Sequence, residues 1–157
     1  MNRIAVFADV QNIYYTTRQV YGRQFNYRKL WQQLSADGEI VSAIAYATHR
    51  SDDRQHKFQN ALKHIGFTVK LKPYIQSSEG SAKGDWDVGI TIDVMDMARD
   101  VDTVVLLSGD GDFDCLLEKI QKDFLVNAEV YGVPDLTAGS LIDAASAFHP
   151  IEEDLLL

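Results

Sequence analysis

Five short runs of apolar and β-branched residues recur along the chain, separated by longer stretches in which polar and apolar positions mix. The runs read RIAVFA, VSAIAYA, FTVKLKPY, TVVLLS and AEVYGV, at residues 3–8, 41–47, 67–74, 103–108 and 128–133. The first and fourth are continuously apolar rather than alternating, as strands buried on both faces are. The pattern therefore predicts an α/β fold of three layers, α/β/α, in which helices cover both faces of a mostly parallel central sheet.

The stretches between these runs carry signals for helix boundaries. Asn26 precedes YRKLWQQL, and Ser51, followed by two aspartates, precedes RQHKFQNALKHI. Both are residue types that cap helix N-termini, whereas Gly66 is a typical C-terminal stop. One segment, QSSEGSAKG at residues 76–84, is rich in Gly and Ser and is predicted to be a mobile loop.

Length and composition narrow the class of protein. A chain of 157 residues has the size of one domain, so we expect a single domain over residues 1–157. No apolar run approaches the roughly 20 residues of a membrane span, so we expect a soluble protein without a membrane partner. The start, MNRIAVFADV, has too short an apolar core for a secretory signal, and the lone Cys115 excludes an internal disulfide. We therefore expect a cytoplasmic location.

Polar residues gather where the predicted strands end. In parallel sheets ligands bind outside the carboxyl ends of the strands, so these residues are candidates for a site even though they lie far apart in sequence. The candidates are Asp9 and Asn12 after the first run, His49, Arg50 and Arg54 after the second, Lys83, Asp85 and Asp87 before the fourth, and Ser108, Asp110, Asp112 and Asp114 after it.

The stretch VVLLSGDGDFDCLL leads directly into three aspartates at alternate positions. Carboxylates held together in a partly dry site repel one another, which costs free energy unless a cation or a shared proton offsets the repulsion. Four aspartates can meet at this edge of the sheet, namely Asp9, Asp87, Asp110 and Asp112. Because the ligands on offer are oxygens and none is soft, the sequence predicts a site for Mg²⁺ or Mn²⁺.

Helical spacing separates the acids of GDWDVGITIDVMDMARD. At about 100° per residue, Asp87 shares a side with the apolar face, so it is predicted to belong to the site. Asp93, Asp96 and Asp100 share another arc and are predicted to face solvent, with a supporting role in the site as the alternative for Asp93. Asp85 is predicted to cap this helix, with a role in the site as its alternative.

Several other kinds of site do not fit. A calcium loop starting at Asp110 would have Cys115 in place of the turn glycine and Gln121 in place of the bidentate glutamate. The chain has no Gly-x-Gly-x-x-Gly after its first strand, no Gly-x-Ser-x-Gly, and no histidines at zinc-ligand spacing. A purely structural role remains open, in which Asp110 and Asp112 only cap the helix that begins near Phe113.

Three segments, FADVQNIYY, KGDWDVGITIDVM and VVLLSGDGDF, resemble in this order the three signature motifs of the NYN domain family, including its LabA-like branch, within the PIN-like nuclease superfamily. The ending GSLIDAASAFHPI is similar to the closing helix of that family, so the resemblance spans nearly the whole chain. It implies a PIN-like fold. It also implies a metal site lined by Asp9, Asn12, Asp87, Ser108, Asp110 and Asp112, with Lys83 preceding it.

Two departures from the family pattern are visible. Val10 stands where the family often has Gly, and Asp85 and Asp114 add two further acids. Neither departure removes a ligand. The extra acids leave open which carboxylate of each neighbouring pair binds the metal, so both are supporting candidates.

The predicted function is a metal-dependent ribonuclease that hydrolyses RNA phosphodiesters, with single-stranded RNA as its partner. One or two divalent ions would bind the scissile phosphate and activate water, with Asn12 and Ser108 orienting the ligands. The candidates for phosphate contacts are Arg50, Arg54 and Lys83. Tyr14 and Tyr15 could stack on a base, although packing in the helix core is the expectation for at least one of them.

Net charge limits this prediction. The formal charge of -8 argues against a general basic surface for nucleic acid, so any RNA contact has to be local. Two alternatives stay open: a catalytically weak RNA- or protein-binding regulatory module on the same scaffold, and a phosphoryl hydrolase acting on a small substrate. A homo-oligomer is compatible with the sequence.

Overall fold

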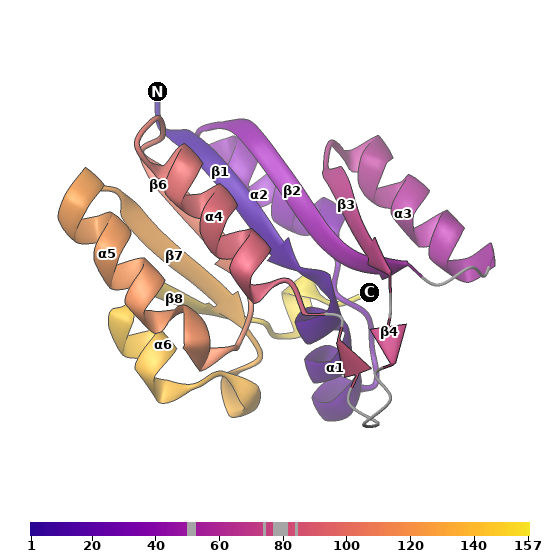
Figure 1. The fold of residues 1–157 in the computed structure, drawn as a ribbon. Coiled ribbons are helices and arrows are strands. Elements are labelled where there is room, and N and C mark those ends of the chain that lie inside the picture. Colours follow the sequence, from indigo (N-terminus) through magenta and orange to yellow (C-terminus); the bar gives the residue numbers. More distant parts are fainter. Residues whose placement is uncertain (50–52, 74, 77–81, 84) are drawn as a thin grey trace.

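A central sheet of six parallel strands dominates the described part of the chain (Figure 1). The computed structural model describes residues 1–49, 53–73, 75–76, 82–83 and 85–157. In spatial order the strands are β3 (Thr68–Pro73), β2 (Glu39–His49), β1 (Arg3–Asp9), β6 (Thr103–Leu107), β7 (Asn127–Gly132) and β8 (Ala147–Pro150). A separate antiparallel pair consists of β4 (Ile75–Gln76) and β5 (Ala82–Lys83). The predicted parallel sheet is therefore confirmed.

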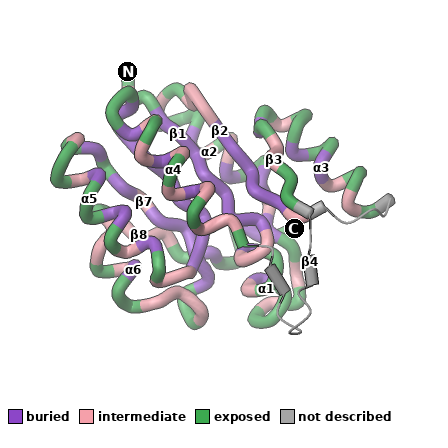
Figure 2. The backbone as a smooth tube through the Cα atoms, viewed as in Figure 1, coloured by how far each residue is buried: buried purple, intermediate pink, exposed green. Residues whose placement is uncertain are grey.

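Helices cover both faces of this sheet. One face carries α1 (Val10–Tyr21), α2 (Tyr27–Asp37) and α3 (Asp53–Ile65), and the other carries α4 (Asp87–Ala98), α5 (Asp114–Phe124) and α6 (Gly139–Ala144). Three short 3₁₀ helices are η1 (Gly111–Phe113), η2 (Pro134–Leu136) and η3 (Glu153–Leu155). The central strands are buried, whereas the outer sides of the helices are exposed (Figure 2). None of the described helices has the length and apolar character to cross a membrane.

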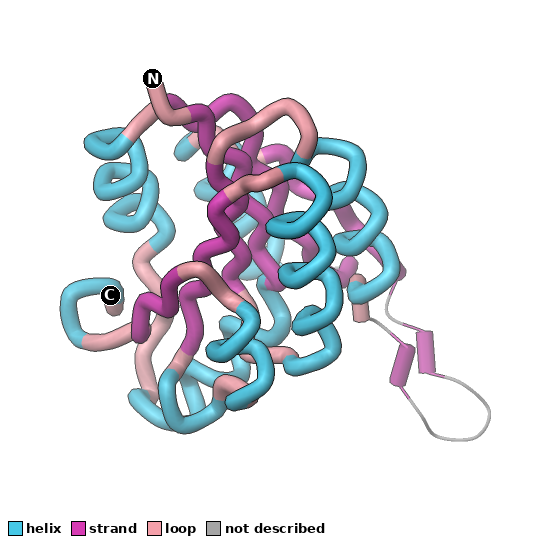
Figure 3. Tube along the Cα trace, turned by 90° about the vertical axis from the view of Figure 1, so that its left-hand side faces the viewer, coloured by secondary structure: helices cyan, strands magenta, loops and turns pink. Residues whose placement is uncertain are grey.

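The strand β1 shows why the sheet needs cover on both sides. Its alternate residues enter two different cores, with Ile4 and Val6 facing α1 and α2, and Ala5 and Phe7 facing α4 and α5. All four are almost completely buried. A continuous apolar run of this kind is stable only in a strand covered on both faces, and the side view in Figure 3 shows the helices on the two sides of the strand layer. The three-layer prediction is confirmed.

The end of the chain differs from the prediction. The segment GSLIDAASAFHPI was expected to be a closing helix, but α6 ends at Ala144 and β8 follows as a sixth strand. The backbone turns extended at Ala145, and Ser146 donates its N–H to the carbonyl of Ala128 at 2.7 Å. The chain thus pairs with the edge of β7. This pairing provides the backbone hydrogen bonds that a longer α6 would have formed internally.

The predicted helix boundaries are largely confirmed. Asn26 caps α2, since its side chain accepts the backbone N–H of Lys29 at 3.0 Å. Gly66 follows α3 with a positive φ of 136°, and a Cβ there would meet the ring of Trp31 at 2.5 Å, so glycine is needed. Ser51 lies outside the described residues. The loop expected over 76–84 instead contributes residues to β4 and β5, and its remaining residues lie outside the described part.

The order of the strands reverses between β1 and β6. From β1 the sheet extends through β2 and β3 on one side and through β6, β7 and β8 on the other. Ligands of open α/β sheets bind where the strand order reverses in this way, outside the carboxyl ends of the strands. Asp9 is the last residue of β1, and Asp110 follows β6 by three residues. The topology therefore brings these two aspartates to the same position.

One aspartate of α4 does not face solvent as predicted. The carboxylate of Asp93 accepts the hydroxyl of Tyr46 and the ammonium group of Lys70, both at 2.7 Å. Tyr46 lies in the core on β2 and Lys70 lies on β3, so helical spacing alone could not reveal either partner. Asp93 is therefore a structural link between α4 and the sheet. The prediction that Asp96 and Asp100 face solvent is confirmed.

We expect Asp93→Ala to lower the free energy of unfolding by about 1–3 kcal/mol, because it leaves the hydroxyl of Tyr46 without its acceptor. Asp96→Ala removes the same charge from the exposed side of the same helix and should change this free energy by less than about 0.5 kcal/mol. Urea unfolding followed by circular dichroism measures both. Equal effects of the two substitutions would contradict the structural role of Asp93.

Candidate metal centre

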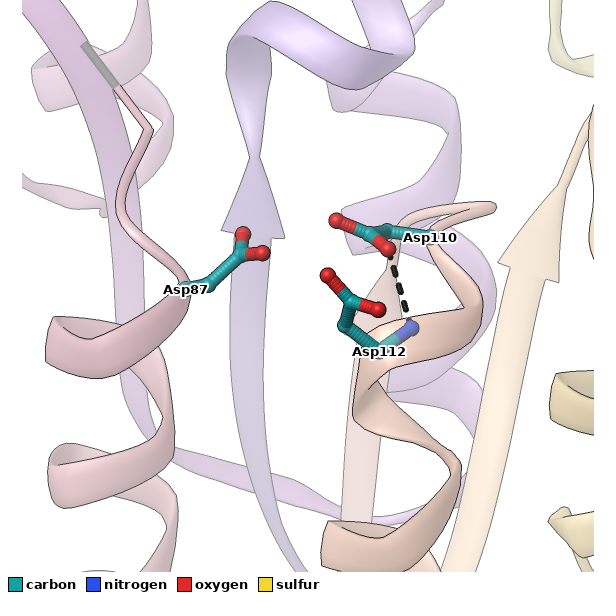
Figure 4. Close-up of side chains that lie close together, drawn as sticks. All are labelled: Asp87, Asp110 and Asp112. Atoms are coloured by element: carbon teal, nitrogen blue, oxygen red, sulfur yellow. Dashed lines mark hydrogen bonds between the residues drawn. The ribbon is translucent and has the colours of Figure 1, made fainter. Parts of the chain in front are cut away.

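Three aspartates converge at the carboxyl end of the sheet. Asp87 begins α4, Asp110 follows β6, and Asp112 lies in η1. Each offers a carboxylate oxygen, and these oxygens all lie within 4.8 Å of one another. Figure 4 shows Asp87 approaching from one side and the other two from the opposite side, with the side chains pointing toward one another. Such a set of oxygen atoms could hold a divalent cation.

The segment after β6 is fixed by hydrogen bonds from neighbouring elements. Gly109 donates its N–H to the side-chain oxygen of Asn12 on α1 at 2.9 Å. Asp110 donates its N–H to the hydroxyl oxygen of Ser108 at 3.1 Å. A side chain at Gly109 would meet the carbonyl oxygen of Leu136 at 2.6 Å, so the segment can approach η2 only with glycine there. These contacts hold the aspartates in place before any ligand arrives.

Asp110 also caps the short helix η1. Its Oδ1 accepts the backbone N–H of Asp112 at 2.9 Å (Figure 4). The capping role that the sequence left open is therefore real. It does not exclude a role in the site, because the same carboxyl group belongs to the cluster of three.

Asp9 lies beside the cluster without belonging to the group of three. It is 8% exposed, and its Oδ2 accepts the hydroxyl of Ser108 at 3.0 Å. The pKa of Asp9 is raised to about 6, chiefly by burial; the hydrogen bonds from Ser108 and Asn12 oppose the rise, and the charges of Asp110 and Asp85 add to it. Ser108 thus connects Asp9 to Asp110, since its hydroxyl donates to one and accepts from the other.

Asp87 has the most perturbed carboxyl group of the cluster. Burial raises its pKa to about 7, and the hydrogen bond with Asp110 and the charges of Asp110, Asp85 and Asp9 all act in the same direction. A group of this kind is neutralised either by a proton or by a bound cation.

The two supporting acids lie differently from the cluster. Asp85 is exposed, and its carboxylate accepts the backbone N–H of Asp87 at 3.2 Å. The N-cap position of α4 is Trp86, so Asp85 holds the start of the helix from one residue before the cap rather than as the predicted cap itself. Its charge nevertheless acts on Asp9 and Asp87. The carboxylate of Asp114 accepts the N–H of Cys115 at 2.6 Å and raises the pKa of that thiol, so its contacts are with its own helix.

The predicted phosphate contacts are only partly described. Arg50 lies outside the described residues, and for Lys83 the structure describes the backbone in β5. Arg54 is exposed on α3, which packs against the outer strand β3 rather than against β1 or β6. The structure therefore does not bring Arg54 to the three aspartates.

Two residues near the site were missed from the sequence. The indole N–H of Trp86 donates to the carbonyl of Ala47 at 3.0 Å, which fixes the start of α4 over the end of β2. The ammonium group of Lys72 lies 5.1 Å from the centre of the Trp86 ring and donates to the carbonyl of Asp85 at 3.3 Å. Lys72 sits inside the apolar run 67–74, where strand propensity concealed it. It supplies a positive charge at the start of α4.

Tyr14 and Tyr15 are both on the surface. Their exposed fractions are 43% and 50%, so the expectation that at least one of them packs in the helix core is wrong. The buried side of α1 is made instead by Val10, Ile13 and Thr17. The hydroxyl of Thr17 is satisfied by the carbonyl of Ile13 at 2.8 Å, which allows a polar residue to occupy that position.

The three-layer fold, with acidic residues at the carboxyl ends of its central strands, is consistent with a PIN-like fold. The family model that matches the chain is the NYN domain, over residues 3–152. The protein therefore belongs to the NYN domain family, and the resemblance drawn from the three motifs is confirmed.

Known proteins agree with this assignment. The chain is 30% identical to the Low amplitude and bright protein LabA of Synechococcus elongatus over 128 residues, which are 76% of this chain and 68% of LabA. A crystal structure of a protein of unknown function from Vibrio parahaemolyticus is 51% identical, with a TM-score of 0.95, and the match covers 99% of this chain and 96% of that one. Ribokinase from Giardia lamblia shares the fold alone, at 12% identity and a TM-score of 0.53 over 97% of this chain and 58% of that one.

Proposed function

We propose that the protein is a metal-dependent ribonuclease that hydrolyses the phosphodiester bonds of single-stranded RNA. The observation that carries the proposal is the convergence of Asp87, Asp110 and Asp112 at the point where the strand order reverses, in a chain of a PIN-like nuclease family. Nucleases of this kind need no covalent nucleophile, and the described residues of the site offer carboxylates, an amide and a hydroxyl.

The donor set fits Mg²⁺ or Mn²⁺. Its ligand atoms are carboxylate oxygens, and these ions prefer oxygen to nitrogen or sulfur. Burial, and after it the neighbouring carboxylates, raise the pKa values of Asp9 and Asp87, so the ionised forms are destabilised and a cation would relieve this. When bound, such a cation supplies the charge that binds the scissile phosphate and lowers the pKa of water.

The residues of the chain divide the remaining tasks. We assign Asp87, Asp110 and Asp112 as the ligands that hold the cation, and Asp9 as a fourth carboxylate beside them. Ser108 positions Asp9 and Asp110 at once through its hydroxyl. Asn12 positions the backbone that precedes Asp110, since its side-chain oxygen holds the N–H of Gly109.

Phosphate contacts have to be local in a chain with a net charge of -8. We propose Lys72 as one contact, because it lies at the start of α4 beside the cluster. Arg50 and Lys83 remain proposed contacts from the sequence. Each phosphate contact should contribute to the salt dependence of RNA binding, because binding releases the counterions of the phosphate.

The test is a cleavage assay on labelled single-stranded RNA with Mg²⁺ or Mn²⁺, repeated with excess chelator. Cleavage that depends on the metal supports the proposal. Parallel reactions with a mononucleotide and with an aryl phosphate separate a ribonuclease from a phosphoryl hydrolase of small substrates. Turnover of only the small substrates would contradict the proposal.

Ser108→Ala should lower the rate of RNA cleavage by about 10- to 100-fold, as the loss of groups that orient metal ligands does. The reason is that Asp9 loses its hydroxyl donor and the N–H of Asp110 loses its acceptor. The matched control is Ser35→Ala, at an exposed position of α2, which should leave the rate unchanged. Equal rates for Ser108→Ala and the wild type would show that this hydroxyl does not organise the site.

A regulatory module that binds RNA without cleaving it is the second candidate. It is favoured by the exposed aromatic pair on α1, which offers a binding surface independent of the carboxylates. The same assay decides between the two, because binding without cleavage in either metal would support the module.

A further inference from the structure

Tyr14 and Tyr15 form an exposed aromatic pair on α1. Their ring centroids lie 5.5 Å apart, and the rings meet edge to face at 77°. Two other tyrosines, Tyr27 and Tyr46, are buried in the two cores, as large aromatic side chains usually are. An adjacent pair that leaves both rings at the surface therefore calls for a ligand with a flat apolar face.

The pair lies on the helix that begins at the metal centre. Helix α1 starts immediately after Asp9 and continues from the end of β1 (Figure 1). Asn12, in its first turn, contacts the segment that carries Asp110. Tyr15 follows Asn12 by three residues, and residues at this spacing are neighbours on a helix, with Cβ atoms about 5–6 Å apart. A strand bound at the carboxylates therefore meets Tyr15 within one helical turn, and the ring of Tyr14 contacts that of Tyr15.

Arg18 adds a positive charge to the same surface. Its Nη1 donates to the hydroxyl of Tyr14 at 2.9 Å, and its guanidinium carbon lies 5.3 Å from the centre of the Tyr14 ring. The side chain is exposed and lies one turn beyond the tyrosines. A guanidinium group held over a ring can both contact a phosphate and extend a stacking surface.

We infer that Tyr14, Tyr15 and Arg18 form a platform on which unpaired bases of single-stranded RNA stack as the strand leads into the metal centre. This inference rests on the proposed function, since it names how the same site selects its substrate. Stacking needs only the flat face of a base, so the platform favours single strands over duplexes without reading the sequence. The guanidinium group provides the local attraction for phosphate that the acidic chain otherwise lacks.

The surroundings of the pair favour RNA over a protein partner. Polar residues flank it on the helix, with Gln11 and Thr16 half-buried and Gln19 exposed, and Val20 is the further exposed apolar side chain of α1 among the described residues. The apolar surface around the rings is therefore small. A stable protein interface generally needs a larger continuous surface, roughly 800 Å² on each partner. A ligand that extends from the tyrosines to the carboxylates would reach the proposed metal centre, which suits a ligand that carries phosphates.

The test measures fluorescence anisotropy of two labelled strands of equal length, oligouridylate and the matching abasic ribose phosphate. Ca²⁺ replaces Mn²⁺, and a gel confirms that the strands stay intact. The variant Tyr14→Leu/Tyr15→Leu removes the rings but keeps apolar side chains, and Tyr14→Phe/Tyr15→Phe keeps the rings. Gln19→Leu, at an exposed position of the same helix, is the matched control.

We expect the leucine variant to bind oligouridylate about 10- to 100-fold more weakly and the abasic strand as the wild type does. Gln19→Leu should bind both strands like the wild type. The phenylalanine variant keeps the rings but loses the hydroxyl that accepts from Arg18, so it should keep the preference for oligouridylate over the abasic strand. Equal affinities of the leucine variant and the wild type for oligouridylate, or an equal loss on both strands, would overturn the inference. So would a change in molar mass of the leucine variant by light scattering, which would identify the pair as a protein interface.

The outcomes separate this inference from the proposed function. If the wild type cleaves RNA while the leucine variant binds oligouridylate normally, the platform is wrong and the ribonuclease stands. If the leucine variant loses the base-dependent binding while the wild type cleaves nothing, the platform stands and the ribonuclease is wrong. A wild type that binds neither strand overturns the platform.

Discussion

Asp110→Asn is expected to slow RNA cleavage by at least about a hundredfold, because it removes a proposed metal ligand rather than a group that orients one. Asparagine keeps the shape of the side chain and an oxygen that can accept the N–H of Asp112, so η1 and the fold should persist. Binding of RNA should survive, since the substitution removes a negative charge from a surface that has to accept phosphates. Initial rates on labelled RNA in Mn²⁺, together with anisotropy, measure the two properties separately.

Asp96→Asn is the matched control for this experiment. It makes the same chemical change on the exposed side of α4, away from the cluster, and should leave cleavage unchanged. Asp9→Asn should behave like Asp110→Asn if Asp9 serves as the fourth carboxylate. Wild-type rates in both Asp110→Asn and Asp9→Asn would show that the metal centre lies elsewhere.

The sheet and the position of the site could be predicted because both depend on local sequence. The continuous apolar run before Asp9 marks a strand buried on both faces, and the run before Asp110 marks a second. Once the strands are parallel, the residues after them must reach the same edge. The convergence of Asp87 with these segments followed from its place on the apolar side of a helix. No knowledge of the other elements was needed.

The rest depended on partners that sequence spacing cannot reveal. Asp93 was expected in solvent because its helical arc is polar, yet Tyr46 and Lys70 reach it from two strands. At least one of Tyr14 and Tyr15 was expected to pack in the core, but Ile13 and Thr17 fill that side of α1. In each case the sequence shows how polar the residue is, but not which residues surround it. Whether a residue lies in the core, links two elements or lies on the surface depends on neighbours from elements distant in the chain.

The strand β8 shows the same limit at the level of an element. The strand has only four residues, is polar in part and ends in proline. Neither alternation nor a continuous apolar run therefore marks it as a strand in the sequence. The segment became a strand because the edge of β7 was open to pairing. Tertiary context of this kind overrides local propensity in short segments.

The raised pKa values of the carboxyl groups in the site have two causes. The sequence indicated repulsion among the aspartates, but burial is the larger reason for the raised pKa values of Asp9 and Asp87, and neighbouring charges come after it. A buried carboxyl group favours its neutral form even without a charged neighbour. The metal-free site should therefore hold protons at a pH where exposed carboxylates have lost them.

This charge state predicts how pH changes the stability of the metal-free protein. The pKa of Asp87 is about 7 in the folded state, against about 3.9 for an ordinary aspartate. A raised pKa contributes stability that is complete below the unfolded value and is lost as pH rises through the folded value. Asp87→Asn cannot ionise and so does not lose this stability. The melting temperature of the variant minus that of the wild type should therefore be larger at pH 7.5 than at pH 5.5.

Mn²⁺ should reverse the loss in the wild type. At about 100 times its dissociation constant, a ligand bound only by the folded state adds about 2.7 kcal/mol, which corresponds to a rise in melting temperature of roughly 5–10 °C for a chain of this size. The rise should be large at pH 7.5 and small at pH 5.5, because protons on Asp9 and Asp87 compete with the metal. Thermal melts at the two pH values measure it.

Two variants separate specific binding from general screening of a chain with a net charge of -8. Asp96→Asn should keep the full rise with Mn²⁺, whereas Asp110→Asn should lose most of it and melt higher than the wild type without metal, because the substitution relieves repulsion on Asp9 and Asp87. A rise of the same size in the wild type and Asp110→Asn would mean that Mn²⁺ acts by screening alone. The three converging aspartates would then stabilise η1 and the start of α4 without holding a metal.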